Sequence, residues 1–129
     1  MGQLKNNFLT FGSPAIGQEE IDEVVDCLKT GWLGTGPKVN QFEDQFKNYI
    51  KNSYAIGLNS CTAALHLSLL ALDIGAGDEV ITTPLTFCAT INSIIHAGAT
   101  PVLADVDPVS MNIDPDKIKE KITKKTKCI

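Results

Sequence analysis

The sequence contains no arginine: all eleven basic residues are lysines, they are outnumbered by fifteen acidic residues, and the formal net charge is −4. This charge balance argues against a nucleic-acid partner, because binding to nucleic acid needs a basic face. Arginine is also the residue that most often grips carboxylates and phosphates with a two-pronged contact. Any anion that this chain binds must therefore be held by backbone amides, hydroxyl groups or lysines.

Several other features are missing as well. The four cysteines, at positions 27, 61, 88 and 128, form no C-x-x-C pair, so the usual spacing of a zinc site is absent and we expect no metal site. No apolar run approaches the roughly 20 residues that a membrane span needs, and no signal peptide is visible. We therefore expect no membrane association, a cytoplasmic location and reduced thiols.

The pattern of apolar residues predicts alternating helices and strands within the length of one domain. After an extended segment over 1–16, we expect helices over 17–30, 38–51, 60–72, 86–97 and 114–123, and strands over 54–58, 79–83, 100–104 and from 128. Strands joined by helices of this length indicate an α/β fold with a mostly parallel sheet and crossover helices. The 60–72 helix is apolar nearly all round, which predicts deep burial.

Ligands of such sheets bind at the carboxyl ends of the strands, which here means 59–60, 83–86 and 105–107. At the first of these ends a short polar turn, Ser60-Cys61-Thr62-Ala63, opens a helix. A helix start offers unpaired N–H groups and a positive dipole end, and so can seat a phosphate. The same residues also make an ordinary helix cap without any ligand.

Two further motifs lie near the other strand ends. Phe87 follows a strand and could stack on a flat cofactor ring, or could be a core residue. The pair Asp105 and Asp107 could hold a metal bound to a nucleotide-sugar, as in glycosyltransferases, although a pair that caps a turn is the more common case. His66 and His96 have no evident catalytic partner in the sequence, so we interpret them as structural.

Taken together, these segments resemble the N-terminal part of the sugar aminotransferases of the DegT/DnrJ/StrS group. The order and spacing of the matching segments agree over nearly the whole chain. They are 31–37 with Phe42-Glu43, 59–66, 77–81, 84–90, 98–102, 105–107 and 112–114.

The resemblance implies the N-terminal portion of the large domain of a type I transferase that depends on pyridoxal phosphate (PLP), with 1–129 as a single incomplete domain. It implies a cofactor-binding site of Cys61, Thr62, Ala63 and Phe87, in which Thr62 and Ala63 contact the phosphate, Cys61 is a backbone neighbour and Phe87 stacks on the pyridine ring. It further implies transfer of an amino group from an amino acid, typically glutamate, to a nucleotide-linked keto-sugar, by a protein that is usually a homodimer or a higher oligomer.

In relatives, the lysine that carries the cofactor as a Schiff base lies far downstream, and no lysine of this sequence matches it. We therefore expect a truncated fragment that has no catalytic residue of its own and is inactive alone. A non-catalytic binding or regulatory relative, a related dehydratase, and a metal-dependent glycosyltransferase-like protein stay open as alternatives.

Overall fold

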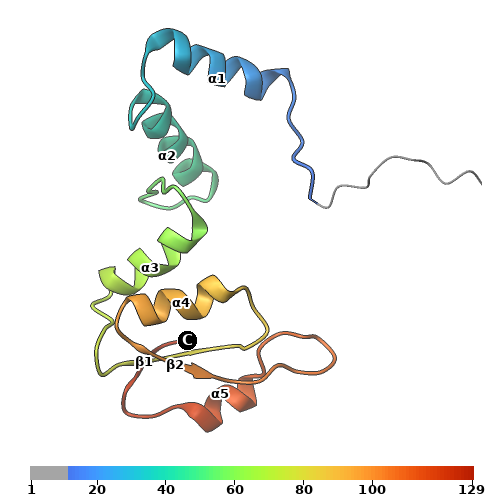
Figure 1. Ribbon diagram of the computed structural model, residues 1–129, viewed down its shortest axis with the longest axis vertical. Coiled ribbons are helices and arrows are strands. Elements are labelled where there is room, and N and C mark those ends of the chain that lie inside the picture. The colour runs from blue at the N-terminus through green and yellow to red at the C-terminus, as the bar shows by residue number, and fades with distance from the viewer. Residues whose placement is uncertain (1–11) are drawn as a thin grey trace, which may run out of the picture. The chain divides into compact units, whose positions relative to one another are not determined.

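The structure, a computed structural model, describes residues 12–129. Its contacts divide the chain into two compact units, which we call unit 1 (up to Gly57) and unit 2 (Leu58–Ile129). Each unit is described by itself (Figure 1). The sequence prediction for residues 1–16 lies largely outside the described part, and 13–16 form no helix or strand.

Unit 1 holds two helices, α1 (Gln18–Thr30) and α2 (Pro37–Tyr49), close to their predicted bounds. Helix α1 ends where the sequence predicts, at Gly31, whose φ of 77° is left-handed and favours glycine. The Gly31 amide donates to the carbonyl of Cys27 at 3.1 Å and so satisfies one free carbonyl of the last turn. Helix α2 begins with a proline, whose fixed φ suits the first helical position.

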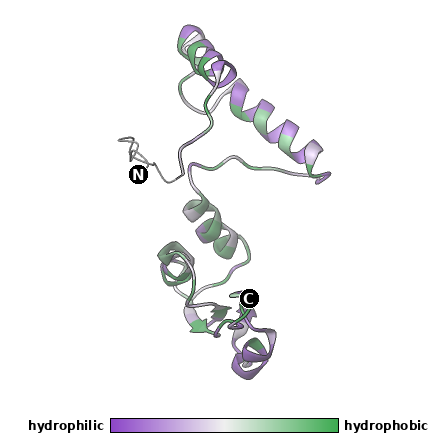
Figure 2. Cartoon of the chain, turned by 90° about the vertical axis from the view of Figure 1, so that its right-hand side faces the viewer, coloured by the Kyte–Doolittle hydropathy of each residue, from purple (hydrophilic) through white to green (hydrophobic). Residues whose placement is uncertain are grey.

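An ion-pair cluster joins the two helices of unit 1. The Lys38 ammonium of α2 contacts the carboxylates of Glu23 and Asp26 on α1. The hydrogen bond to Glu23, followed by the one to Asp26, raises the pKa of Lys38. Apolar and polar residues alternate along both helices (Figure 2). The apolar face of α1, which consists of Ile21, Val24, Val25 and Leu28, is exposed.

Unit 2 is built on a three-stranded parallel sheet with the order β2-β1-β3, where β1 is Glu79–Thr82, β2 is Thr100–Leu103 and β3 is Thr126–Cys128. Helices α3 (Cys61–Ala71) and α4 (Cys88–His96) lie on one side of the sheet, and α5 (Pro115–Lys121) lies on the other (Figures 1 and 2). The predicted α/β class with a parallel sheet and crossover helices is confirmed.

The core of unit 2 forms around the central strand, β1. Successive strand residues point to opposite faces, so Val80 and Ile81 are buried on the two faces of the sheet. Val80 belongs to an apolar cluster with Leu69 of α3, Ile94 of α4 and Ile74. Burial on both faces is typical of a parallel sheet that is covered by helices.

Two expectations from the sequence are wrong for this structure. Residues 54–58 form no strand, because no neighbouring strand pairs with them within residues 12–129, and Tyr54 and Ile56 are about four-fifths exposed, at 82% and 79%. Helix α3 is not deeply buried either. Only Leu69 of that helix is buried, whereas Leu67 and Leu70 are exposed, because α4 packs on just one side of α3 and Leu69 alone reaches the cluster around Val80. None of the helices in residues 12–129 is long and apolar enough to span a bilayer.

Candidate functional site

One edge of unit 2 collects the segments that the sequence singles out. Strand β1 leads into the 83–87 loop and β2 into the 104–114 loop, so both loops leave from the carboxyl ends of the strands. Helices α3 and α4 pack against each other and begin at this same edge, on the right in Figure 1. The carboxyl ends of parallel strands are where open α/β sheets bind their ligands.

The first turn of α3 is capped by its own serine. The Ser60 hydroxyl accepts a hydrogen bond from the Ala63 amide at 3.1 Å, and the Ser60 carbonyl accepts from Ala64 at 3.1 Å. Within residues 12–129, the amides of Cys61 and Thr62 have no hydrogen-bond acceptor. These two exposed N–H groups lie at the positive end of the helix dipole.

The residues of this turn fit a phosphate group. Cys61 and Thr62 are exposed and Ala63 is half-buried, so an anion can approach the backbone between small side chains. Two amides without acceptors, together with the Thr62 hydroxyl, supply three donors, which matches the need of phosphate oxygens for donors. The arginine that commonly grips phosphates is not required for such a site.

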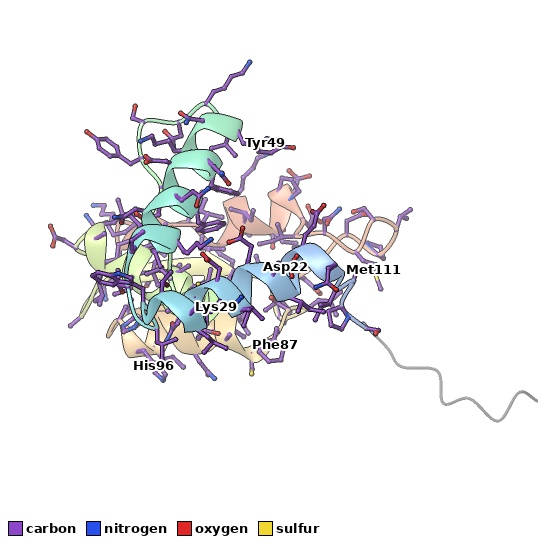
Figure 3. All side chains as sticks on the ribbon, turned by 90° about the horizontal axis from the view of Figure 1, so that it is seen from above. Asp22, Lys29, Tyr49, Phe87, His96 and Met111 are labelled. Carbon is purple, nitrogen blue, oxygen red and sulfur yellow. The ribbon has the colours of Figure 1, made fainter. Side chains whose placement is uncertain are left out.

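Phe87 lies at the start of α4, as its N-cap residue. The residue is 77% exposed, and its side chain is labelled in Figure 3. Phe87 is therefore not the core residue that the sequence left open as an alternative. The exposed ring offers an apolar face at the ligand edge, which fits stacking on a flat ring. Phe87 and the 60–62 turn thus stand at the starts of α4 and α3, two helices that begin at the same edge of unit 2 (Figure 1).

The two aspartates after β2, Asp105 and Asp107, accept hydrogen bonds from backbone amides of the loop in which they lie. The Asp107 carboxylate accepts hydrogen bonds from the amides of Val109 at 3.1 Å and Ser110 at 2.7 Å, and Asp105 accepts from the amide of Val106 at 2.8 Å. The bonds from Ser110, followed by that from Val109, hold the pKa of Asp107 below its ordinary value. These contacts favour the turn-capping interpretation over the metal site.

His66 and His96 form a contact between α3 and α4, with ring centroids 6.0 Å apart and an edge-on arrangement. This contact fits the structural role that the sequence suggests for both. Within residues 12–129, no group of three or more histidine, cysteine or acidic side chains is placed to hold a metal ion.

One contact was not foreseen from the sequence. The Glu43 carboxylate of α2 accepts a hydrogen bond from the Gly57 amide at 2.7 Å, in a half-buried position within unit 1. Glu43 and Lys47 have the i, i+4 spacing of a helix-surface ion pair, so the sequence favours a pair between these two residues and gives no sign of the bond to Gly57. In the structure Lys47 pairs with Asp44 instead, and Glu43 holds the backbone.

A helix start lined by small residues and an exposed aromatic residue at the ligand edge of a parallel α/β unit can together hold a flat, phosphorylated molecule. The chain belongs to the DegT/DnrJ/EryC1/StrS aminotransferase family, whose profile matches residues 14–129. This confirms the family resemblance, and the solved relatives agree with a fold that is the N-terminal part of a type I PLP-dependent transferase.

Individual relatives agree with this assignment. The spore coat polysaccharide biosynthesis protein SpsC of Bacillus subtilis is 54% identical over 129 residues, which is all of this chain and 33% of SpsC. Spr1654 of Streptococcus pneumoniae, a candidate sugar aminotransferase solved in its PLP form, matches with a TM-score of 0.88 and 43% identity over 92% of this chain and 30% of that one.

The aminotransferase of Psychrobacter cryohalolentis matches with a TM-score of 0.82 and 46% identity, over 88% of this chain and 29% of that one. The chain thus spans about a third of the length of the relatives that it matches.

Proposed function

We propose that this chain forms the phosphate-binding and ring-stacking part of a PLP-dependent sugar aminotransferase, which moves an amino group from glutamate to a keto-sugar carried on a nucleotide. The observation that carries the proposal is the pair of exposed amides without acceptors, on Cys61 and Thr62, at the start of α3, beside the start of α4 where the exposed Phe87 is the N-cap residue. We propose that residues 1–129 contribute to one cofactor-binding domain of a homodimeric cytoplasmic enzyme.

Each residue of the proposed site has a distinct task. The amides of Cys61 and Thr62 and the Thr62 hydroxyl donate to the phosphate oxygens, and the small Ala63 leaves room for them. Phe87 covers one face of the cofactor ring and keeps water from it. The cofactor supplies the chemistry when bound, as an electron sink for the amino-group transfer, while this chain positions it.

The proposal is tested with the protein expressed from its complete reading frame. We expect the purified protein to take up pyridoxal phosphate with a visible absorption band. Addition of glutamate should change the band, and a keto-sugar nucleotide should restore it with formation of an amino-sugar nucleotide. Absence of cofactor uptake would contradict the proposal. Uptake without turnover of any nucleotide-linked keto-sugar would contradict the proposed substrate and leave the proposed cofactor site standing.

A matched pair of variants assigns the phosphate contact. Thr62→Val keeps the side-chain shape and removes the hydroxyl donor, so we expect weaker binding of pyridoxal phosphate. Ser68→Ala removes an exposed hydroxyl from the same helix, away from its first turn, and should leave the affinity unchanged. If both variants bind pyridoxal phosphate equally well, the Thr62 hydroxyl does not contact the phosphate.

A further inference from the structure

Helix α4 begins on a residue that cannot cap it. In unit 2, α3 begins on Ser60 and α5 on Asp114, and both side chains accept a hydrogen bond from a first-turn amide. The N-cap residue of α4 is Phe87, whose side chain makes no such bond. Polar side chains are strongly preferred at this position, because they satisfy amides that have no partner within the helix. Phe87 is also exposed, so core packing does not explain the aromatic side chain, and local rules are typically broken at functional sites.

Two threonine hydroxyls hold the start of α4 in the absence of a cap. Thr86, the residue before Phe87, and Thr90, in the first turn of α4, form a hydrogen bond between their hydroxyl oxygens at 2.9 Å. The Thr90 amide also donates to the Phe87 carbonyl at 3.0 Å. Phe87 therefore lies inside a short loop of backbone that is closed by a bond between the side chains on either side of it.

The strand side of the same loop is fixed as well. The Thr83 hydroxyl, directly after β1, accepts a hydrogen bond from the Leu85 amide at 3.1 Å. The 83–87 loop is thus held by Thr83 at the end of the strand and by the bond between Thr86 and Thr90 at the start of the helix. All of these contacts lie within unit 2.

The direction in which a side chain leaves the backbone is set by the backbone dihedrals, and its rotamers depend on them too. The backbone of Phe87 is extended, with φ of −68° and ψ of 143°. We propose that Thr86 and Thr90 are positioning residues for Phe87: their hydroxyl bond fixes this backbone, so that the ring is in place before the cofactor binds. This inference rests on the proposed function, since it names residues that support the ring-stacking part of the same site without touching the cofactor.

The size of the effect has an upper bound. A stacked aromatic pair contributes about twofold to tenfold in affinity, and a residue that positions one ring of the pair cannot contribute more than the pair does. The effect is also confined to the ring. Inorganic phosphate uses only the α3 turn, which is capped by Ser60 and not by these threonines, so its affinity should stay the same.

The experiment measures the dissociation constants of pyridoxal phosphate and of inorganic phosphate for the whole protein and its variants. Thr90→Val keeps the side-chain shape without the hydroxyl, and should weaken pyridoxal phosphate by about twofold to tenfold while sparing inorganic phosphate. Thr90→Ser keeps the hydroxyl and should restore most of the affinity. Thr86→Val should match Thr90→Val, and the double variant should bind no more weakly than either one, because both changes remove the same bond.

The matched control is a threonine of unit 1. The Thr30 hydroxyl is exposed and donates to the Cys27 carbonyl at 3.1 Å, so Thr30→Val also removes one surface hydrogen bond. We expect this variant to change neither dissociation constant.

A double-mutant cycle separates positioning of the ring from a general structural role. In the Phe87→Ala background there is no ring to position, so Thr90→Val should cause no further loss of affinity for pyridoxal phosphate. The same loss in both backgrounds would indicate a structural role and overturn the inference, as would a parallel loss of affinity for inorganic phosphate. Unchanged binding in Thr90→Val, or no recovery in Thr90→Ser, would overturn it too. If the unmodified protein binds no pyridoxal phosphate, the proposed function fails and the inference fails with it, a result that is visible before any variant is made.

Discussion

The indole ring of Trp32 lies over Gly36, so that a β-carbon added at Gly36 would come within 2.8 Å of Trp32 Cε3. Gly36 caps the start of α2, and its carbonyl accepts from the amides of Val39 at 3.1 Å and Asn40 at 3.2 Å. Its backbone is extended, with φ of −165°, which any residue adopts. Glycine is therefore required here by the ring above it and not by its own backbone.

The first prediction is that Gly36→Ala destabilises the protein by about 0.5–1.5 kcal/mol, because the new methyl group forces the exposed Trp32 indole away from its preferred rotamer. The control is Gly34→Ala in the same loop, where an added β-carbon would meet nothing within 4 Å. The measurement is the free energy of unfolding from denaturant titration. Trp32→Ala in the Gly36→Ala background should recover part of the loss, and equal stabilities for the two alanine variants would contradict the prediction.

The second prediction separates the cap of α3 from its proposed phosphate contact. Ser60→Ala removes the acceptor of the Ala63 amide and should cost about 1 kcal/mol of stability. Ser60→Asp keeps a good cap but places a negative charge beside the two free amides. It should therefore preserve the unfolding free energy and still weaken the binding of pyridoxal phosphate. Unweakened binding in Ser60→Asp would contradict a phosphate at this turn.

Much of unit 2 could be predicted from the sequence, because its signals are local. The cap at Ser60, the proline that opens α5 and the two four-residue strands with their intervening helix all follow from spacing and turn chemistry. The Gly31 terminus of α1 follows in the same way. The candidate ligand edge could be predicted too, since parallel strands place their carboxyl ends together.

The misses concern interactions that local patterns do not encode. The segment 54–58 has the composition of a buried strand, but a strand exists only where a neighbour pairs with it. The apolar sequence of α3 shows what the helix can bury, whereas its actual exposure depends on what packs against it. The Glu43–Gly57 hydrogen bond joins residues fourteen positions apart through a side chain and leaves no periodic signal.

The third prediction concerns Phe87. Because Phe87 is 77% exposed, Phe87→Ala should change the unfolding free energy of the cofactor-free protein by no more than about 0.5 kcal/mol. A stacked aromatic pair is worth about 0.5–1.5 kcal/mol, so the affinity for pyridoxal phosphate should fall by roughly twofold to tenfold. Phe87→Tyr keeps the ring and should bind normally. A large loss of stability without any loss of affinity would make Phe87 a structural residue.

The fourth prediction is a pH dependence of the turn after β2. Two backbone amides donate to the Asp107 carboxylate and hold its pKa below the ordinary value of 3.8. A lowered pKa in the folded state means that the charged form stabilises the turn. That stabilisation is complete above pH 3.8 and is lost as the pH falls through the lower, folded value. Nuclear magnetic resonance titration of the Asp107 carboxyl should therefore show a midpoint below 3.8, with the amide signals of Val109 and Ser110 moving at the same midpoint.

Asp107→Asn retains an acceptor oxygen without the titrating group, so the amide signals of Val109 and Ser110 should no longer shift with pH in this variant. A midpoint at or above the ordinary value would contradict the turn-capping role and reopen the search for another partner of this carboxylate.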